Sequence, residues 1–567
     1  MKTQQTNRMP EASRRYRPYP TMDMPDRQWP AKIIDTAPTW CSVDLRDGNQ
    51  ALIDPMGHER KARMFRLLLD MGFKEIEIGF PSASQTDFDF ARWCVTEGPD
   101  GDGTPEDVSL QVLVQCRPEL ITRTFEALEG ANKPIVHFYN STSELQRRVV
   151  FGQDRAGIKR IAVDAAKMVA DMAAKACGGF RFQYSPESFT GTEIEFSLEI
   201  CNAVTEVIQP TPDNPLIHNL PATVEMSTPN IHADQIEWMS RNLDNRESIV
   251  LSLHTHNDRG TGIAATELGL MAGADRVEGT LFGNGERTGN VDIVTLGLNM
   301  FTQGVDPQLD ITDIERIRDV YEHCNQLKIP ERHPYVGELV YTAFSGSHQD
   351  AINKGMKAIK GKNDPKWEVP YLPIDPQDVG RTYEAIVRIN SQSGKGGIAY
   401  VLDADYGLKL PRGMQVELRE IVQAVTDEEG TELSSARIYD LFQQAYIERP
   451  EGKMRFVDYA TSPAPNGGRQ IEAHITDNGK TVTINGHGNG PVDSFCDAIG
   501  TYLGKAVTVA DYSEHSLGSG SDATAICYME LEIDGHSVFG AGVNPNISAA
   551  SLEAVLAAAD RHRDKTS

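Results

Sequence analysis

Short runs of apolar, β-type residues alternate with longer stretches of helical composition between positions 40 and 282. This alternation is typical of parallel βαβ units, in which a helix follows each strand and covers the sheet. The runs span about the 250 residues typical of a (β/α)8 barrel. Eight of them can be counted, at residues 40–45, 75–80, 109–115, 134–139, 180–184, 216–219, 249–253 and 276–281. The pattern therefore predicts an α/β fold with a closed TIM barrel, and a doubly wound open sheet is the alternative.

The pattern changes twice after the barrel. Beyond residue 312 it is largely helical and includes a Pro-rich stretch (369–379) and a Gly-rich stretch (391–397), which we interpret as an accessory region covering the barrel mouth. From about residue 452 alternating β patterns return, and DNGKTVTINGHGNGPVDSF (477–495) parallels IDGHSVFGAGVNPNISAASL (533–552). Each copy has a hairpin turn, a strand, a Gly-x-Gly and a helix. Two β-β-α repeats therefore predict a separate C-terminal α+β domain.

These changes predict four segments. They are an N-terminal arm (1–30), a catalytic TIM barrel (31–310), helical linker subdomains (311–430) and a C-terminal regulatory domain (431–567). The arm is polar, rich in Pro and Arg, and lacks the apolar core of a secretory signal. More than one domain is also expected because 567 residues exceed the size at which a single core keeps growing.

Composition indicates which kinds of molecule this chain can bind. A formal net charge of −26 opposes binding to nucleic acid or anionic lipid, and the apolar runs are shorter than a membrane span. The eight cysteines form no CxxC pair, which favours reduced thiols in a cytoplasmic protein. We therefore expect small-molecule partners, with no nucleic acid and no membrane.

Polar residues gather directly after the predicted strands. The carboxyl ends of barrel strands meet on one face, where active sites of this fold lie, so these side chains are expected to converge. They are Arg46, Asp47, Glu187, Thr223, His254, His256, Asn284 and Glu286.

The strongest local signal is the His254-Thr255-His256 sequence after the seventh run. Positions i and i+2 of a strand point to the same side, so both imidazoles can face one ion. Asp47 can add a carboxylate and Asn290 an amide oxygen, although a turn residue and a helix N-cap are equally good interpretations of each alone. This nitrogen and oxygen set suits Mg²⁺, with Mn²⁺ or Zn²⁺ as alternatives.

Such a metal site predicts carbonyl chemistry. A divalent ion can polarise the carbonyl of a 2-oxo acid while a carbon nucleophile attacks it. The nucleophile needs a base, and its enolate oxygen needs a cation or donor. Arg46, beside Asp47, is placed for the second task, and a surface salt bridge is the alternative interpretation. The Gly-rich SGKGG lacks the spacing of a phosphate-binding loop, so nucleotide hydrolysis is not expected.

Several segments along the chain carry a resemblance to a known family. They are LRDGNQ, YSPESFTGTE, NLPATVE, HTHNDRG, GNGERTGN, FSGSHQDAI and PYLPIDPQDVGRTYEAIVRINSQSGKGG. Together they resemble the 2-isopropylmalate synthases in their longer bacterial form, from about residue 27 to 559. HTHND and LRDG are also shared with homocitrate synthases, citramalate synthases and related lyases, so they indicate only the superfamily.

The resemblance implies a role for each matching residue. The metal ligands would be Asp47, His254, His256 and Asn290. Arg46 would stabilise the thioester enolate, Thr223 would hold the carboxylate of the 2-oxo acid, and His254 would also contact substrate. Proton transfer and CoA positioning would fall to Glu187, Glu286, His348 and Tyr383. In the family His348 and Tyr383 reach the barrel of the partner subunit, which implies a homodimer.

The C-terminal repeat resembles the leucine-sensing domain of the same family. The segment matching the leucine site comprises Gly488, Asn489, Gly490, Pro491, Val492 and Asp493. Glycines there would leave backbone N–H groups accessible to a carboxylate, and the adjoining helix N-terminus favours an anion. Close packing of the repeats would also need glycines, and a structural dimerisation role is an equal alternative.

The resemblance therefore implies an acyltransferase that condenses acetyl-CoA with 2-oxoisovalerate and water, giving 2-isopropylmalate and CoA. This would be the first committed step of leucine biosynthesis, inhibited by L-leucine and activated by a monovalent cation such as K⁺. A citramalate or homocitrate synthase is the alternative within the superfamily. A non-catalytic leucine sensor is the alternative from another class.

Overall fold

The computed structural model describes residues 12–343, 345–362, 366–383, 395–429, 433, 435–448, 450, 452–464, 467–517 and 523–566. The chain forms two compact units, Met1–Val340 with Pro376–Thr382, and Tyr341–Asp375 with Tyr383–Ser567. The first part of the predicted arm, residues 1–11, and most of the Gly-rich stretch at 391–397 lie outside the described residues.

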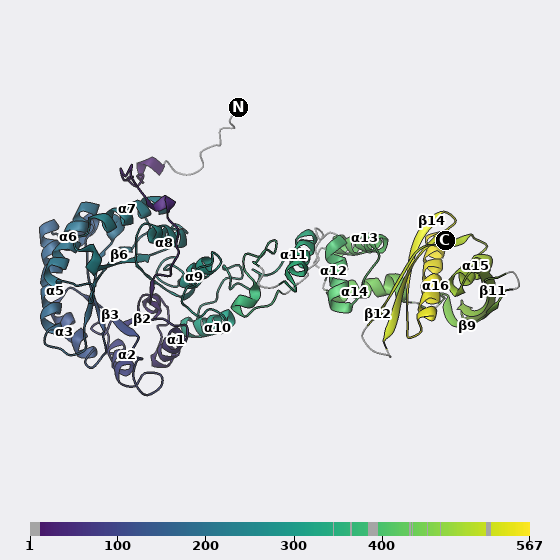
Figure 1. The fold of residues 1–567 in the computed structure, drawn as a ribbon, viewed down its shortest axis with the longest axis horizontal. Coiled ribbons are helices and arrows are strands. Elements are labelled where there is room, and N and C mark those ends of the chain that lie inside the picture. Colours follow the sequence, from purple (N-terminus) through teal and green to yellow (C-terminus); the bar gives the residue numbers. More distant parts are fainter. Residues whose placement is uncertain are drawn as a thin grey trace, which may run out of the picture. The chain divides into compact units, whose positions relative to one another are not determined.

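The first unit is built on a closed barrel of eight parallel strands in sequence order (Figure 1). The TIM barrel predicted from the hydrophobic pattern is confirmed, and the open-sheet alternative is wrong because β1 pairs with β8. The strands are β1 (Thr39–Ser42), β2 (Glu75–Gly79), β3 (Ser109–Gln115), β4 (Ile135–Ser141), β5 (Arg181–Glu187), β6 (Leu216–Ala222), β7 (Ile249–Thr255) and β8 (Arg276–Gly279).

Helices surround the barrel and pack against it. In α1, for example, Met64, Phe65 and Leu68 are completely buried, whereas polar positions between them face outward. The surrounding helices are α1 (His58–Asp70), α2 (Gln85–Thr96), α3 (Pro118–Ala127), α5 (Arg155–Ala173), α6 (Ile194–Ile208), α7 (Pro229–Asn242), α8 (Gly262–Met271), α9 (Ile293–Phe301) and α10 (Ile314–Asn325).

The strand ends differ from the prediction in an informative way. The first run was expected to continue to residue 45, but Asp44–Gly48 forms a single π-helical turn instead. The fifth, sixth and seventh strands run further than expected, to Glu187, Ala222 and Thr255. In β5 and β7 the predicted ends are the apolar Tyr184 and Leu253, whereas backbone pairing continues through polar residues to Glu187 and His254. As a result, Glu187 and His254 are held inside the ladder rather than in the loops.

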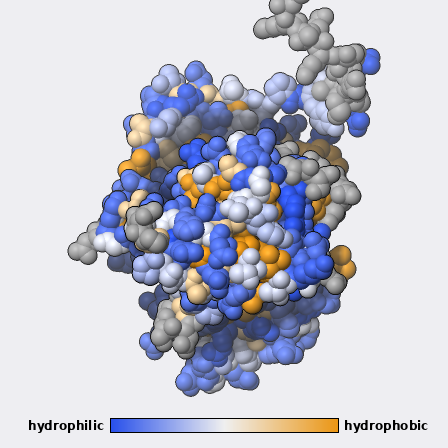
Figure 2. Space-filling view, turned by 90° about the vertical axis from the view of Figure 1, so that its right-hand side faces the viewer, coloured by the Kyte–Doolittle hydropathy of each residue, from blue (hydrophilic) through white to orange (hydrophobic). Residues whose placement is uncertain are grey.

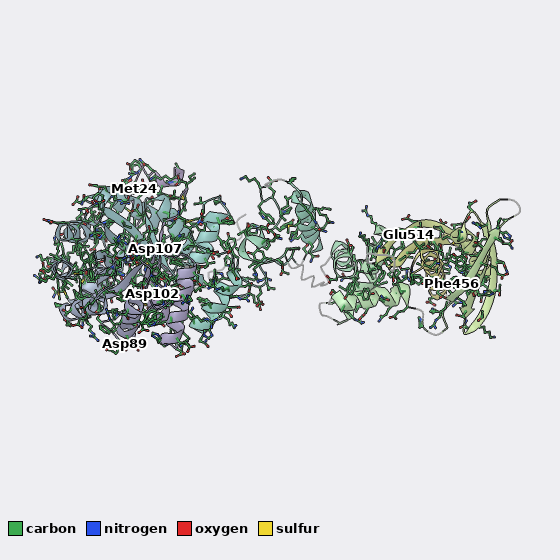
Figure 3. The ribbon with its side chains drawn as sticks, turned by 60° about the horizontal axis from the view of Figure 1, so that its bottom comes forward. Met24, Asp89, Asp102, Asp107, Phe456 and Glu514 are labelled. Carbon is green, nitrogen blue, oxygen red and sulfur yellow. The ribbon has the colours of Figure 1, made fainter. Side chains whose placement is uncertain are left out.

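Part of the N-terminal arm is ordered against the barrel. Met24 (Figure 3) is buried, and Arg27 donates to Asp234 of α7 at 2.8 and 2.9 Å. The backbone N–H groups of Gln28 and Trp29 donate to the carboxylate of Glu237 at 2.9 Å. These contacts fasten residues 24–29 to the outside of the barrel.

The second unit combines helices with two sheets. Each predicted repeat has a third strand, giving a three-stranded antiparallel sheet followed by a helix. The predicted C-terminal α+β architecture is confirmed. The first repeat comprises β9 (Arg455–Pro463), β10 (Arg469–Asp477), β11 (Lys480–Gly488) and α15 (Pro491–Leu503), and the second β12 (Val507–Leu517), β13 (Thr524–Ile533), β14 (His536–Asn544) and α16 (Ile547–Thr566).

The remaining helices of this unit are α11 (Gly346–Ile359), α12 (Lys395–Tyr406), α13 (Arg412–Glu429) and α14 (Ser435–Phe442). Leu402 of α12, Leu418 of α13 and Phe442 of α14 share one buried core with residues of β13 and β14. All eight cysteines are free thiols. Among the helices that the structure describes, none has the length and apolar character needed to cross a bilayer.

Candidate metal and substrate site

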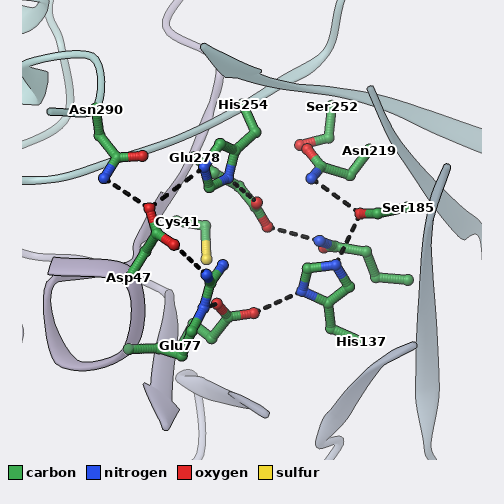
Figure 4. A network of polar contacts seen from close by, with 12 residues as sticks. Cys41, Asp47, Glu77, His137, Ser185, Asn219, Ser252, His254, Glu278 and Asn290 are labelled. Carbon is green, nitrogen blue, oxygen red and sulfur yellow. Dashed lines mark hydrogen bonds and ion pairs between the residues drawn. The ribbon is translucent and has the colours of Figure 1, made fainter. Parts of the chain in front are cut away.

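Asp47, His254 and His256 meet at the carboxyl end of the barrel. The Nε2 atoms of the two imidazoles lie 3.7 and 3.6 Å from Oδ2 of Asp47. Two ligands that share an ion at about 2.1 Å lie roughly 3.0–3.4 Å apart, so a small contraction would bring all three onto one ion. The structure thus gathers residues from two strand ends that are far apart in the sequence (Figure 4).

The neighbours of each imidazole orient its free nitrogen. The Nδ1–H of His254 donates to Glu278 at 2.9 Å, and that of His256 donates to the Ala222 carbonyl at 3.0 Å. With Nδ1 occupied, Nε2 of each ring is left as an acceptor directed at the shared space. A carboxylate or carbonyl behind the ring is the arrangement found behind metal-binding histidines.

Asn290 completes the set. A backbone bridge pairs it with His256, and its Nδ2 donates to Asp47 at 2.8 Å and to the Asn284 carbonyl at 2.9 Å. Its Oδ1 is buried and has no hydrogen-bond partner among the residues that the structure describes. An unsatisfied buried acceptor is costly, by about 1–3 kcal/mol, which a cation would relieve. The residues present therefore fit a divalent ion.

Charge supports the same conclusion. Although burial raises the pKa of Asp47, the Arg46 guanidinium and the two imidazoles hold it well below its ordinary value, so the group is a carboxylate. Burial lowers the pKa of His254, but the negative charges of Asp47 and Glu278 outweigh it and raise the pKa to about 9. The same negative charges favour a cation bound beside His254.

Arg46 points its guanidinium into the same space. Its Nη1 donates to Asp47 and its Nε to Glu77, and the side chain is almost completely buried. Two carboxylates on one side fix the plane of the guanidinium. The charged group is therefore rigid and lies beside the candidate metal ligands.

The predicted substrate-binding residues line one cavity of about 200 Å³. The Thr223 hydroxyl accepts a hydrogen bond from the Ser188 N–H at 2.9 Å, and Glu187 accepts one from Ser141. The cavity brings together Arg46, Asp47, Glu187, Thr223, His254, His256 and Glu286. Asn284, expected in the same cluster, instead anchors its loop by donating to the Gly48 carbonyl and to Asn325, both at 3.0 Å.

Comparison with known proteins identifies the family of this chain. The model described as HMGL-like matches residues 37–320, the one described as alpha-isopropylmalate synthase, post-catalytic domain-like, matches 338–403, and the LeuA allosteric (dimerisation) domain matches 432–562. The curated 2-isopropylmalate synthase of Agrobacterium fabrum is 72% identical over 555 residues, 98% of this chain and 99% of that protein. This chain belongs to the 2-isopropylmalate synthase family.

Other relatives span the same length. The 2-isopropylmalate synthase of Rhizobium meliloti is 72% identical over 98% of this chain and 99% of that protein, and that of Mycobacterium leprae is 57% identical over 96% and 92%. Among solved structures, an HMG-CoA lyase of Bacillus subtilis has 20% identity and a TM-score of 0.42, covering 56% of this chain and 98% of that one.

One part of this family member's site escaped the sequence-based prediction. Beneath the candidate ligands, Glu77, His137 and Glu278 form a second buried cluster. The Nδ1–H of His137 donates to Glu77 at 2.6 Å, and its Nε2 is hydrogen-bonded to Ser185 at 2.7 Å. Gln111 donates to Glu77 and Glu278 at 2.6 and 2.9 Å. The sequence did carry a signal for this cluster, because its three members are polar residues within predicted barrel strands.

This second cluster is already saturated. The oxygens of Glu77 accept from Arg46, Gln111 and His137, and those of Glu278 accept from Gln111, Gln183, Arg276 and His254. Every carboxylate oxygen therefore has an N–H donor in place of an ion. The cluster supports Arg46 and His254 from below.

His348 and Tyr383 belong to the second unit. The His348 ring stacks on Tyr371 with centroids 4.0 Å apart. Their predicted action at the barrel of a partner subunit stays a prediction.

The segment predicted to sense leucine lies where β11 meets α15. At Gly488 a Cβ would lie 2.5 Å from the Ser494 backbone nitrogen, and at Gly542 of the second repeat 2.1 Å from the Ala550 carbonyl oxygen. These two glycines allow each strand to pack on the helix of its own repeat. Gly490 is different, because nothing lies within 4 Å of the space its Cβ would fill. Asn489 donates its N–H to Asp493 at 2.8 Å.

Proposed function

We propose that this chain condenses acetyl-CoA with 2-oxoisovalerate and water to give 2-isopropylmalate and CoA, and that L-leucine inhibits the reaction. The observation that carries the proposal is the meeting of Asp47, His254 and His256 beside Arg46, in a chain similar over almost its whole length to proteins named 2-isopropylmalate synthase.

We infer that Asp47, His254, His256 and Oδ1 of Asn290 hold a divalent metal, with Mg²⁺ preferred and Mn²⁺ or Zn²⁺ as alternatives. When bound, the ion would polarise the keto group of the 2-oxo acid. The unpaired Oδ1 of Asn290 and the two outward Nε2 atoms support this assignment.

The side chains around the cavity fit the remaining steps. Thr223 uses its oxygen to accept from Ser188, so its O–H can donate to the carboxylate of the 2-oxo acid. Arg46 presents N–H donors to the oxygen that becomes negative when the acetyl methyl group loses a proton. Glu187, Glu286 and His348, with Tyr383, are the proposed groups for moving that proton and positioning CoA.

The cavity wall favours a branched apolar substrate. Phe80, Leu113 and Pro221 line it together with the polar groups. The isopropyl group of 2-oxoisovalerate can contact these side chains, whereas the second carboxylate of 2-oxoglutarate would be desolvated against them.

The decisive experiment measures release of free thiol from acetyl-CoA across a panel of 2-oxo acids. Fastest release with 2-oxoisovalerate is expected. A preference for pyruvate or 2-oxoglutarate would instead make the chain a citramalate or homocitrate synthase. If calorimetry detected leucine binding while no 2-oxo acid released thiol with any divalent metal, the chain would be a leucine sensor.

We also propose that the enzyme is a cytoplasmic homodimer in which His348 and Tyr383 serve the partner's barrel, with K⁺ as an activator. Support comes from the matched dimerisation domain and from apolar side chains exposed on β12, where Val509 is 39% and Tyr512 46% exposed. Figure 2 shows hydrophobic residues, in orange, among hydrophilic ones on the face that it presents.

Mixing two inactive variants tests the shared site. Asp47→Ala and His348→Ala damage different parts of it, so a mixed dimer would contain one barrel with both groups intact. We expect mixing, after dissociation and reassociation, to restore up to about a quarter of the wild-type turnover. No recovery in mixtures shown to contain heterodimers would contradict the arrangement.

A further inference from the structure

Three loops at the barrel mouth are fastened to one another next to the proposed substrate site. They follow β6, β7 and β8, and they carry Thr223, His256 and Glu286 into the cavity. Just beyond these residues lie Asp258, of the HTHND segment, and Arg287, of the GNGERTGN segment. Neither has a role in the proposed reaction.

Arg287 joins all three loops. Its Nε and Nη2 donate to the carboxylate of Asp258 at 2.7 and 3.2 Å, and Nη2 also donates to the backbone carbonyl of Thr223 at 2.5 Å. Asp258 in turn accepts from the Glu225 N–H at 2.9 Å. The Thr223–Glu225 segment is therefore held at one end by Arg287 and at the other by Asp258.

The backbone of Arg287 is strained. Its φ is +59°, in the left-handed region that residues with a Cβ rarely adopt. Such strain, of order 1–3 kcal/mol, persists only where surrounding contacts over-determine the conformation, and it occurs often at ligand sites. The ion pair is also partly protected from solvent, since the Asp258 side chain is 16% exposed.

We propose that Arg287 and Asp258 are positioning residues that hold Thr223 in the orientation required to bind the carboxylate of the 2-oxo acid. The Thr223 side chain is tied to Ser188 and its carbonyl to Arg287, so the direction of its O–H is set from both ends. Loss of the clamp would let Thr223 move, which weakens binding of the 2-oxo acid more than it slows the chemical step. This inference rests on the proposed function.

A different role for Arg287 makes a different prediction. Arg287 also lines the cavity, so it could contact the substrate carboxylate itself. In that case Asp258→Asn would leave affinity for the 2-oxo acid nearly unchanged. In a clamp, removal of either partner has the same consequence, and removal of both adds little.

The opposite end of the barrel offers a matched control. There Arg246 donates to Asp275 at 2.8 Å and to the carbonyls of Ile249 and Gly273 at 2.7 and 3.0 Å. This is the same chemistry, an arginine bound to one aspartate and to backbone carbonyls, and the two arginine side chains are 29% and 38% exposed. The amino-terminal face of this fold contributes to stability rather than catalysis.

The test uses the full-length, metal-loaded enzyme, with thiol release measured at saturating acetyl-CoA and binding of 2-oxoisovalerate measured by calorimetry. For Arg287→Gln and Asp258→Asn we expect KM and Kd for 2-oxoisovalerate to rise about tenfold, the scale of one lost charge-assisted hydrogen bond. KM for acetyl-CoA and kcat should change by less than about threefold. The double variant should match the single ones, Arg287→Lys should recover part of the affinity, and Arg246→Gln should leave KM at the wild-type value.

Unchanged affinity in either single variant, additive effects in the double variant, or an equal loss in Arg246→Gln would each overturn the clamp. If Arg287→Gln fails to fold, Arg287→Lys, which keeps the positive charge, replaces it in the same measurements. If the wild-type enzyme releases thiol with 2-oxoisovalerate and the variants behave like it, only the clamp is wrong. If the wild-type enzyme releases thiol with no 2-oxo acid, the proposed function fails and the clamp fails with it.

Discussion

The barrel mouth and the C-terminal repeat are each marked by a short sequence motif, but the two motifs act in opposite ways. At the mouth, the strand end carrying His254 and His256 directs two Nε2 atoms toward Asp47, beside the unpaired amide oxygen of Asn290. In the repeat, Gly486 and Gly488 press β11 against α15 until a Cβ would lie 2.2 and 2.5 Å from backbone atoms. One motif exposes chemical groups, and the other closes a gap between two elements. The motif alone does not predict whether its residues present chemical groups or pack two elements together.

Substitution of Asp47 should have the largest effect on the barrel mouth. Asp47→Ala should abolish metal binding and reduce turnover by at least about a thousandfold, since Lewis-acid catalysis is worth several kcal/mol. His256→Ala should behave alike. Treatment with a chelator should inactivate the wild-type enzyme, and Mg²⁺ should restore it. Turnover retained in metal-depleted buffer would disprove the metal-assisted mechanism.

Substitution of Glu278, in the buried cluster beneath the candidate metal ligands, should have a smaller effect. In Glu278→Gln, His254 loses the carboxylate that orients it, so we expect metal affinity to fall by about 10–100-fold. Titration of the metal-free protein measures this directly. Ser252→Ala is the control, because Ser252 binds Arg276 of the same network at 2.9 Å without contacting His254. Equal losses in both variants would mean that Glu278 acts through general stability.

In the C-terminal repeat, the close packing at Gly488 predicts an effect on domain stability rather than on turnover. Gly488→Ala should lower the free energy of unfolding of the C-terminal domain by about 1–3 kcal/mol, because the added methyl group meets helix backbone. Hydrogen exchange in β11 and α15 would report the change. Gly490→Ser is the matched control, because its Cβ meets nothing within 4 Å and serine is a good N-cap for α15. Similar exchange rates in the two variants would contradict the packing account.

The smallest change in the leucine-free enzyme is expected for Gly490→Asp. An aspartate fits this open N-cap position, so the domain should fold and leucine-free turnover should stay within about twofold of wild type. Leucine inhibition should weaken by roughly 5–150-fold, the range of a typical coupling free energy. A dose–response curve with leucine measures it, and an unchanged curve would argue against this segment as the leucine site.

Much of the fold followed from local patterns. Each of the eight runs became a barrel strand, and the repeat of hairpin, Gly-x-Gly and helix identified both halves of the C-terminal domain. The predicted ends of the fifth and seventh strands, Tyr184 and Leu253, fell short of the observed ones, which placed Glu187 and His254 just outside the strands. The third strand of each repeat was also missed, since β9 and β12 are mostly exposed and lack a strong apolar alternation.

By itself, the sequence determined the barrel, the second domain and the residue types at the strand ends, because periodicity and composition act over neighbouring residues. Only the tertiary structure decided which groups were free and which were already satisfied. Asn290 leaves its oxygen unpaired while every oxygen of Glu77 and Glu278 is occupied, and Arg287 reaches back across the loops to Thr223. Those differences depend on hydrogen bonds between positions tens to hundreds of residues apart, for which a single sequence carries no local signal.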